Sequence, residues 1–508
     1  MVTTPKAHLA APTVRGTYGL LLGAGSMVLA IGLMVPFVVA DKPVATLSAT
    51  SPTSLGGGTG GSSTGSPTAQ PSAGPSAGPG GATTGPGGST GAGGTTSAGG
   101  FGGAGGGNTP ASARKASDIG IDRDTIKLGV LIPKDNSSSA GGSFSQVVGD
   151  PKQQWNAYIS EVNDKGGILG RKITPIFREY DGLNLDAQRA ACVYLTEQAK
   201  VFAIVNSGGF YGDPILCVTQ QHKTPFIGQA GEALDFYQKS NGLYFSTTPN
   251  KDRVLRNLVA VASRDGVFKG KTVGILSRDG IDAIPVDRSL KPALKAAGIK
   301  VTYEARISAD DSAAQSQIPL EVQQMRSAGV NFIMLETGLI VANVFVQQAD
   351  SQRYYPQYIT SDFASGGADI YTIGMPASFA GAVSYTALRT GEARAGIPET
   401  ATDGACRKIY ERRAGKKLDR TNTEYYLTVT ACGILEQFTR GMNTAGINPT
   451  RSTLSTALQG LGVFDVPFSG EGSWRPGKFD APDVVRRTTW KGDCRCWIPV
   501  APFTRTPV

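Results

Sequence analysis

The stretch IKLGVLIPKD (126–135), followed by WNAYISEVNDKGGILGRKITPIFREYDG (155–182), decides the fold of this chain. IKLGVLI has the composition of a buried strand, because it is a short run of aliphatic and β-branched residues. The segment 151–164 has helical spacing, and the glycines at 166–170 end that helix before a second strand, KITPIFREY (172–180). A strand, a helix and a strand in this order predict a βαβ unit, and therefore a parallel sheet.

The same alternation of strand and helix continues along the chain. Two more strands, FAIVN (202–206) and PFIG (225–228), alternate with helices at 186–199 and 213–222. After the extended stretch 243–250 the pattern restarts, with strands predicted at 272–276, 300–305, 331–335, 357–360 and 380–385, and helices near 251–265, 285–297, 317–328 and 340–352. A helical part (402–415, 423–443 and 450–460) and the segment VVRRTTW (484–490) complete the chain. The pattern predicts an α/β protein of two doubly wound lobes, with a central ligand cleft at the carboxyl ends of the strands.

These segments resemble the branched-chain amino acid (Leu/Ile/Val) binding proteins of ABC importers, which have the type I periplasmic-binding fold. The most specific run is Glu161–Lys172, ending in GGILGRK, and the resemblance continues through KTVGILSRDGI (271–281) and YITSDFASG (358–366). It implies an extracytoplasmic solute-binding protein that captures a small polar ligand, an amino acid or similar, by hinge closure. Its partners would be the permease subunits of an ABC importer. The alternative is a ligand-sensing ectodomain of the same fold, coupled to another membrane partner.

The predicted ligand-binding region, 118–508, divides into two lobes. We expect lobe one at about 120–248 and 381–465, and lobe two at about 249–380 and 466–508. The lobes would be joined by crossings near Thr247–Pro249 and Ser378–Gly381.

In lobe one, the resemblance places ligand contacts in the loops after the third and fourth strands. The first loop contains Gly209, Phe210 and Tyr211, ahead of a helix N-terminus that can bind a ligand carboxylate. The family's serine falls at Gly209. The second loop contributes Ala230 and Glu232, where the glutamate replaces a small or hydroxyl residue.

In lobe two, Asp362 matches the acidic residue that holds the ligand ammonium, and Tyr385 is a candidate apolar wall. The family's ligand-stacking tyrosines are replaced near Ile281 and near Gly338 or Leu339, so the ligand is not plain leucine. Because Glu232, Glu336 and Asp362 all follow strand ends, we expect a cleft with more negative than positive charge. Each acid has an alternative role as a solvated loop carboxylate or a helix cap.

The N-terminal part predicts attachment to a membrane. Residues 1–15 are expected to form a short cytoplasmic N-terminus, and Gly16–Ala40 carries no charge over a length that can span a bilayer. We expect a transmembrane anchor that places the protein at the cell surface, with a cleaved signal peptide as the alternative. The segment 41–117 is rich in Gly, Ser, Thr and Pro and is predicted to be a disordered linker.

Composition argues against other classes of function. The net charge is +9, of which +5 belongs to residues 118–508, and without a dense Lys/Arg stripe we expect no nucleic-acid binding. The chain has two histidines, His8 and His222, and no G-x-S-x-G, H-E-x-x-H or P-loop motif. We therefore predict no enzyme activity, no cofactor and no metal site, and we interpret His222 as a surface or packing residue.

All six cysteines lie after the membrane segment, which indicates an oxidising compartment. Spacing favours the local pairs Cys192–Cys217 and Cys406–Cys432, which fall on consecutive predicted helices. Cys494 and Cys496 remain as a geometrically tight C-x-C pair. A zinc site is the competing interpretation of that C-x-C motif, but further ligands are missing nearby.

Overall fold

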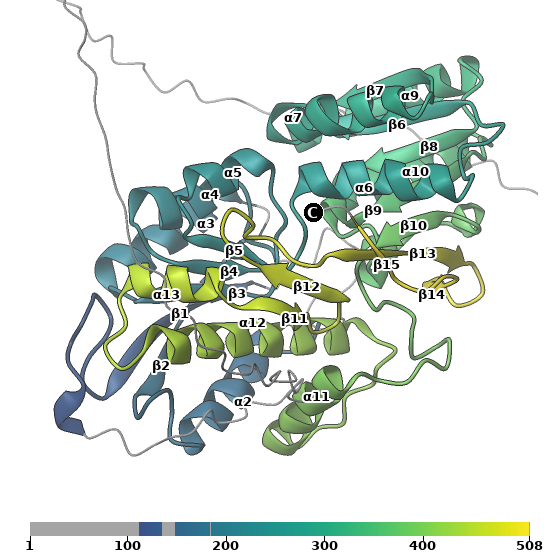
Figure 1. Cartoon of the computed structure of the whole chain (residues 1–508). Coiled ribbons are helices and arrows are strands. Elements are labelled where there is room, and N and C mark those ends of the chain that lie inside the picture. The colour runs from purple at the N-terminus through teal and green to yellow at the C-terminus, as the bar shows by residue number, and fades with distance from the viewer. Residues whose placement is uncertain (1–110, 135–147, 183, 507–508) are drawn as a thin grey trace, which may run out of the picture. The chain divides into compact units, whose positions relative to one another are not determined.

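A computed structural model describes residues 111–134, 148–182 and 184–506 of the chain. These residues form two α/β lobes, each built on its own sheet (Figure 1). The predicted membrane segment 16–40, and the linker up to residue 110, lie outside the described residues. Within the described part of the chain, no helix combines the length and the apolar character needed to cross a bilayer.

Lobe one contains a five-stranded parallel sheet in the order β2-β1-β3-β4-β5. Its strands are β1 (Thr125–Pro133), β2 (Lys172–Tyr180), β3 (Ala203–Asn206), β4 (Phe226–Gly228) and β5 (Tyr244–Ser246). The helices that the chain forms between these strands are α2 (Pro151–Asp164), α3 (Leu185–Val193), α4 (Asp213–Leu216) and α5 (Leu234–Lys239). Later segments complete its core: α11 (Ala401–Ala414), α12 (Thr423–Ala445), α13 (Arg451–Gln459) and the hairpin β11 (Gly462–Asp465) and β12 (Glu471–Trp474). The βαβ units predicted around 126–180 are confirmed.

Lobe two contains a sheet in the order β14-β13-β10-β9-β8-β6-β7, with β15 paired to β13. Its parallel strands are β6 (Val273–Arg278), β7 (Val301–Ile307), β8 (Phe332–Glu336), β9 (Gln357–Ser361) and β10 (Val383–Thr386). The strands β13 (Val484–Lys491), β14 (Cys496–Pro499) and β15 (Thr504–Arg505) extend this sheet in antiparallel fashion. Its helices are α6 (Lys251–Arg264), α7 (Ala283–Pro285), α8 (Lys291–Ala296), α9 (Asp311–Ser327) and α10 (Leu339–Ser351). Apolar side chains from these helices fill the core on both faces of the sheet.

Within its described residues, the chain passes between the lobes three times. The crossings follow β5, β10 and β12, since each of these strands precedes an element of the other lobe. Strand β10, which the sequence analysis assigns to lobe one, lies instead in the sheet of lobe two, where it pairs with β9 and β13. Strand β12, assigned to lobe two, packs its Trp474 into the core of lobe one. Both differences arise because a strand's sequence pattern does not record which sheet accepts its hydrogen bonds.

A buried ion network ties the third crossing to the start of α6. The Asp480 carboxylate accepts hydrogen bonds from the Asn250 backbone N–H (2.7 Å) and from Arg253 Nε (2.9 Å). Arg253 also pairs with Asp483 at 3.1 Å, and Lys478 pairs with Asp483 at 2.9 Å. Burial acts to raise the pKa of Asp480, but the charges of Arg253 and Lys478 outweigh this effect and hold the pKa below its ordinary value. The first and third crossings are therefore fixed to one another.

Candidate ligand-binding site

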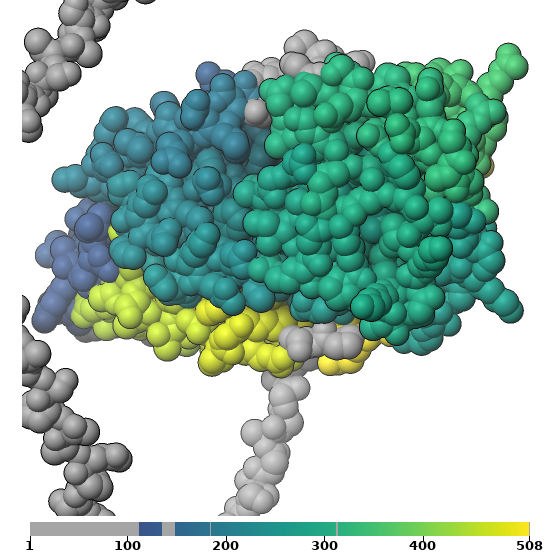
Figure 2. Space-filling model, turned by 90° about the horizontal axis from the view of Figure 1, so that it is seen from above, coloured from purple at the N-terminus to yellow at the C-terminus, as the bar shows by residue number. Residues whose placement is uncertain are grey.

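Loops at the carboxyl ends of the two sheets meet between the lobes. The loops after β3 and β4 belong to lobe one, and the loop after β6 and the first turn of α6 belong to lobe two. Gly212 of lobe one lies close to Ile281 of lobe two, because a Cβ atom placed on Gly212 would be 3.5 Å from Cδ1 of Ile281. Figure 2 shows the blue-to-teal surface of lobe one and the green surface of lobe two in contact along a seam. This is the edge of the sheets at which α/β proteins bind ligands.

An ion-pair cluster centred on Lys251 links the lobes. Lys251 Nζ lies 3.2 Å from Glu232 Oε2 in lobe one and 2.8 Å from Asp282 Oδ1 in lobe two. The second oxygen of Glu232 accepts a hydrogen bond from the Gly212 backbone N–H at 2.7 Å. The Lys251 ammonium also lies 5.2 Å from the centre of the Phe363 ring. Burial acts to lower the pKa of Lys251, but the carboxylates of Asp282 and Glu232 outweigh this effect and hold the pKa above its ordinary value.

Asp362 is buried at the end of β9 and is engaged within lobe two. Its Oδ1 accepts a hydrogen bond from Thr386 Oγ1, and its Oδ2 accepts one from the Ala387 backbone N–H, both at 2.6 Å. Burial raises the pKa of Asp362 to about 6. Burial raises the pKa of the Tyr426 hydroxyl, on α12 of lobe one, and the nearby charge of Asp362 raises the Tyr426 pKa further. The carboxylate expected to hold a ligand ammonium therefore lies near the lobe contact, with both oxygens already accepting hydrogen bonds.

A buried polar cluster lies beside Asp362 at the ends of β6, β8 and β9. Ser361 Oγ donates to Glu336 Oε2 at 2.7 Å, and burial raises the pKa of Glu336 to about 8. Ser277 is the register partner of Glu336 across the β6–β8 pair. Among the described residues, Glu336 Oε1, Ser277 Oγ and Thr337 Oγ1 are buried without a hydrogen-bond partner. Buried polar atoms of this kind are costly to leave unpaired, so they are suited to pairing with a polar ligand.

The remaining predicted residues of lobe one lie in two different environments. Tyr211 is 37% exposed beside the lobe contact, and Gly209 adopts a φ of +76°, which disfavours the family's serine at this position. The Ala230 carbonyl accepts a hydrogen bond from Ser246 Oγ at 2.7 Å. Phe210, in contrast, is fully buried, with its ring 5.4 Å from that of Tyr180 in the core of lobe one.

Tyr385, the predicted apolar wall, lies in the core of lobe two. Its hydroxyl donates to Asp265 Oδ2 at 2.7 Å, and Asp265 caps the C-terminal end of α6. Lys251 begins the same helix, which has 14 residues. A helix of this length spans about 20 Å, so the Tyr385 hydroxyl is far from the Lys251 cluster.

Four residues of these clusters were not predicted from the sequence: Lys251, Asp282, Ser277 and Thr337. The positions of Ser277 and Thr337 carried a usable signal, because each is a hydroxyl residue at the carboxyl end of an apolar strand. Lys251 carried none, since a basic residue in the first turn of a helix is ordinarily solvated.

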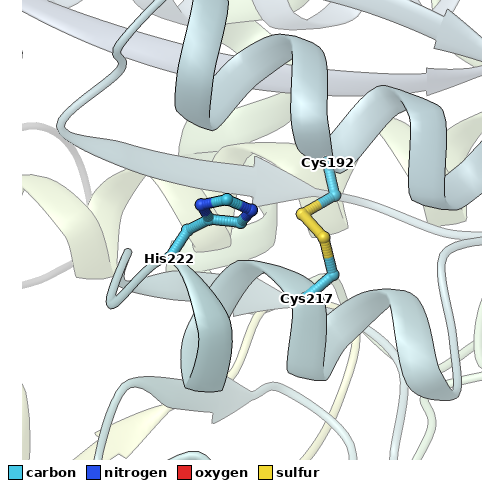
Figure 3. A group of neighbouring side chains, drawn as sticks. All are labelled: Cys192, Cys217 and His222. Carbon is cyan, nitrogen blue, oxygen red and sulfur yellow. A yellow bond between two sulfur atoms is a disulfide. The ribbon is translucent and has the colours of Figure 1, made fainter.

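Cysteine pairing follows the predicted pattern. The structure joins Cys192 to Cys217, Cys406 to Cys432 and Cys494 to Cys496. Figure 3 shows His222 beside the first of these disulfides, the three side chains being close enough to ligate one metal ion. The two sulfur atoms are bonded to one another and offer no thiolate, so the group does not have the ligands of a zinc site. His222 Nε2 instead lies 3.4 Å from Glu197 Oε1.

Two such sheets, joined by three crossings and in contact at their carboxyl-end loops, define a two-lobed binding protein of the type I periplasmic-binding fold. A family model described as periplasmic binding protein matches residues 125–484, and the chain belongs to this family. The family consists of solute-binding proteins, so the chain is a binding protein and not an enzyme. The resemblance seen in the sequence is confirmed.

Solved structures show the same fold at low sequence identity. A fatty acid ABC transporter substrate-binding protein from Thermomonospora curvata is 18% identical with a TM-score of 0.60, covering 78% of this chain and 96% of its own. A solute-binding protein of an ABC transporter from Rhodopseudomonas palustris BisB5, in complex with 3,4-dihydroxy benzoic acid, is 17% identical with a TM-score of 0.57, covering 75% and 98%. A branched chain amino acid ABC transporter protein from Thermus thermophilus with bound valine is 14% identical with a TM-score of 0.57, covering 75% and 96%. No curated protein matches the chain.

Proposed function

We propose that this protein captures a small polar solute outside the cytoplasm by hinge closure and delivers it to the permease subunits of an ABC importer. The observation that carries the proposal is the meeting of the carboxyl-end loops of both sheets around the Lys251 ion pairs. A ligand held there contacts both lobes at once, so its binding energy favours the closed arrangement.

The ligand class follows from the relatives and from the polar groups at the lobe contact. Valine and 3,4-dihydroxy benzoic acid, the ligands named for two of the solved structures, share a carboxylate. We propose a carboxylate-bearing solute, with an amino acid as the first candidate. The loop at Gly209–Tyr211 would receive the carboxylate, and Asp362 would receive the ammonium.

A thermal-shift screen of amino acids, their amides and small organic acids tests this proposal. A ligand that binds only the folded protein raises its stability by RT ln(1 + [L]/Kd), so a true ligand raises the unfolding temperature in proportion to the logarithm of its concentration. If no member of these three classes raises it, the proposed ligand class is wrong.

A substitution then tests the role of Asp362 with the compound found. Asp362→Asn keeps the shape of the side chain and removes its charge. For an amine-bearing ligand we expect calorimetric affinity to fall roughly 10- to 100-fold. Asp265→Asn is the matched control, because Asp265 lies at the far end of α6, where its carboxylate accepts a hydrogen bond from Tyr385 and lies 3.9 Å from Arg264 Nε, all within lobe two. Equal affinity in Asp362→Asn and the control would show that Asp362 does not hold an ammonium.

The alternative is a sensing ectodomain coupled to a different membrane partner. The two functions differ in what the closed protein contacts. Stimulation of a reconstituted permease–ATPase by the ligand-loaded protein supports import, and its absence with a confirmed ligand supports sensing.

A further inference from the structure

One of the three disulfides differs from the other two in its exposure to solvent. Five of the six cysteines are at most 2% exposed: Cys192, Cys217, Cys406, Cys432 and Cys496. Cys494 is the exception, because it is exposed on the turn between β13 and β14. Cys494–Cys496 is therefore the disulfide that presents a cysteine to reagents in solution while the protein stays folded.

The same disulfide closes the shortest loop. Its cysteines have a sequence separation of 2, compared with 25 and 26 for the other two pairs. Loop-closure entropy grows with loop length, so this disulfide stabilises the folded protein least. Reducing a disulfide in a folded protein loses the stability that the disulfide supplies. The Cys494–Cys496 bond is therefore the easiest of the three to open on energetic grounds as well.

The hairpin that carries this disulfide is anchored by other contacts. Strands β13 and β14 pair in antiparallel register, and each contributes a fully buried tryptophan, Trp490 and Trp497. The ring of Phe379 lies 5.4 Å from that of Trp490 and 6.0 Å from that of Trp497. The Trp497 backbone N–H also donates to Asp369 Oδ1 at 3.0 Å. Opening the disulfide therefore leaves this edge of the sheet in place.

The turn lies far from the proposed ligand contacts. Strand β13 runs antiparallel to β10, so the end of β13 that leads into the turn lies at the amino end of β10. The loops that meet lobe one lie at the opposite, carboxyl edge of the same sheet. Figure 1 shows the β13–β14 hairpin on the side of lobe two away from the strands β1–β5. Chemistry at this turn is therefore spatially separate from ligand capture.

We propose that Cys494–Cys496 is a thiol-exchange site for low-molecular-weight thiols. A thiolate attacks Sγ of Cys494, and a mixed disulfide forms there as the Cys494–Cys496 bond breaks. The electron pair of the broken bond leaves on Sγ of Cys496, which takes a proton from solvent. A second thiolate then attacks the reagent's sulfur in the mixed disulfide and releases Cys494 as a thiolate. Two thiols are thereby oxidised to one disulfide, and the cysteine pair is reduced to two thiols.

Partial reduction of the folded full chain tests this site, with the two buried disulfides as internal controls. The chain is incubated with glutathione without denaturant, free thiols are blocked with iodoacetamide, and tryptic peptides are read by mass spectrometry. Trypsin cleaves after Arg495, so Cys494 and Cys496 fall on separate peptides. We expect this pair to open at least about tenfold faster than the buried pairs, which react only when the fold opens around them. Glutathione should be found on Cys494, and the alkyl group on Cys496.

Two matched single variants test the direction of attack. In Cys496→Ser the Cys494 thiol remains on the exposed turn, whereas in Cys494→Ser the Cys496 thiol remains buried. We expect a maleimide to modify Cys494 in the first variant at least about tenfold faster than Cys496 in the second. Equal circular dichroism spectra of the two variants establish that the fold is the same in both.

Several results would overturn the proposal. One is opening of all three disulfides at the same rate, or of a buried disulfide first. Another is glutathione attached to Cys496 in place of Cys494, or equal maleimide rates in the two single variants. Free thiols at both positions in the untreated protein would show that no disulfide is present there to exchange. None of these readouts depends on which solute the protein captures.

Discussion

Lys251 is the residue that most directly joins the two lobes. Its ammonium pairs with one carboxylate from each lobe, and Glu232 in turn accepts the Gly212 backbone N–H. Since the Lys251 side chain is largely buried, these contacts are screened less by solvent than a surface ion pair is. The Lys251 ammonium therefore joins a carboxylate of lobe one to a carboxylate of lobe two at this contact.

Replacing Lys251 with Met should open the ligand-free protein. The substitution removes both ion pairs and leaves the buried Glu232 carboxylate opposed to lobe two without a cation. We expect a longer and broader distance distribution between spin labels at Lys239→Cys in lobe one and Lys295→Cys in lobe two. These labels react selectively, because all six native cysteines are in disulfides.

Lys291→Met is the matched control for this experiment. Lys291 pairs with Asp287 and Glu304, and all three residues lie within lobe two. Its loss should leave the distance unchanged. If Lys251→Met and Lys291→Met give the same distribution as wild type, the ion pairs do not hold the lobes together.

Glu336 is a carboxyl group whose burial makes stability depend on pH. Its pKa is raised to about 8, so the folded protein keeps this proton between pH 4.5 and 8 while the unfolded chain loses it. The folded state binds more protons in this window, and stability therefore falls as pH rises through it.

Replacing Glu336 with Gln should remove this part of the pH dependence. Relative to wild type, we expect the variant to gain roughly 3 kcal/mol of unfolding free energy between about pH 5 and about pH 8, measured by urea unfolding. Glu161→Gln is the control of opposite sign. Burial acts to raise the pKa of Glu161, but the hydrogen bonds from Arg412 and Arg413 outweigh this effect and lower the pKa to about 2. The Glu161→Gln variant should therefore lose the same unfolding free energy at both pH values. A Glu336→Gln variant with the wild-type slope would show that this carboxyl ionises normally.

Individual site residues could be predicted from the sequence only where their local position decides their role. Glu232 was predicted because it follows a strand and matches a contact loop of the family. Its partner Lys251 is 19 residues away, and Asp282 is another 31 residues from Lys251. Such pairings depend on how two lobes approach, and strand and helix patterns do not contain that information.

At the scale of elements, two disulfides connect consecutive helical segments. Cys406 on α11 and Cys432 on α12 close a loop with a sequence separation of 26, whereas Cys494 and Cys496 are separated by 2. Loop-closure entropy grows with loop length, so the longer connection stabilises the folded protein more.

Removing the α11–α12 disulfide should therefore lower the free energy of unfolding more than removing the Cys494–Cys496 disulfide does. For Cys406→Ala/Cys432→Ala we expect a loss of about 3 kcal/mol, and for Cys494→Ala/Cys496→Ala about half of that, from denaturant unfolding of each variant. Losses in the reverse order would contradict this ranking. Peptide mapping without reductant provides the independent check on the pairs themselves.

The parallel strands and the longer helices followed from the sequence, whereas the short strands β11, β12, β14 and β15 and the assignment of segments to lobes did not. The parallel strands were predicted from aliphatic runs, and the helices from their periodicity, because both patterns are local. Strands β10 and β12 were each placed in the opposite lobe, since the choice of sheet is made by partners more than twenty residues away, such as Ile359 for Val383.

At the scale of the whole molecule, the sequence before residue 111 predicts where the protein is found. Because Gly16–Ala40 is long enough to span a bilayer, we expect the protein to fractionate with membranes and to resist extraction by high salt. Detergent should release it. Mature protein that begins at Asp41 and is recovered from the culture medium would show a cleaved signal instead.

The interleaved path of the chain also bears on synthesis. The sheet of lobe two begins with β6 at Val273 but receives β13 only from Val484 onward, after the chain has returned to complete lobe one. Until β13 has been made, one edge of β10 has no partner strand, and about a hundred residues separate the two strands in the chain. A ribosome adds that many residues in roughly 5–20 seconds. In that interval its exposed backbone can pair with other chains. We therefore expect chains that stall before Val484 to aggregate more readily than the complete chain.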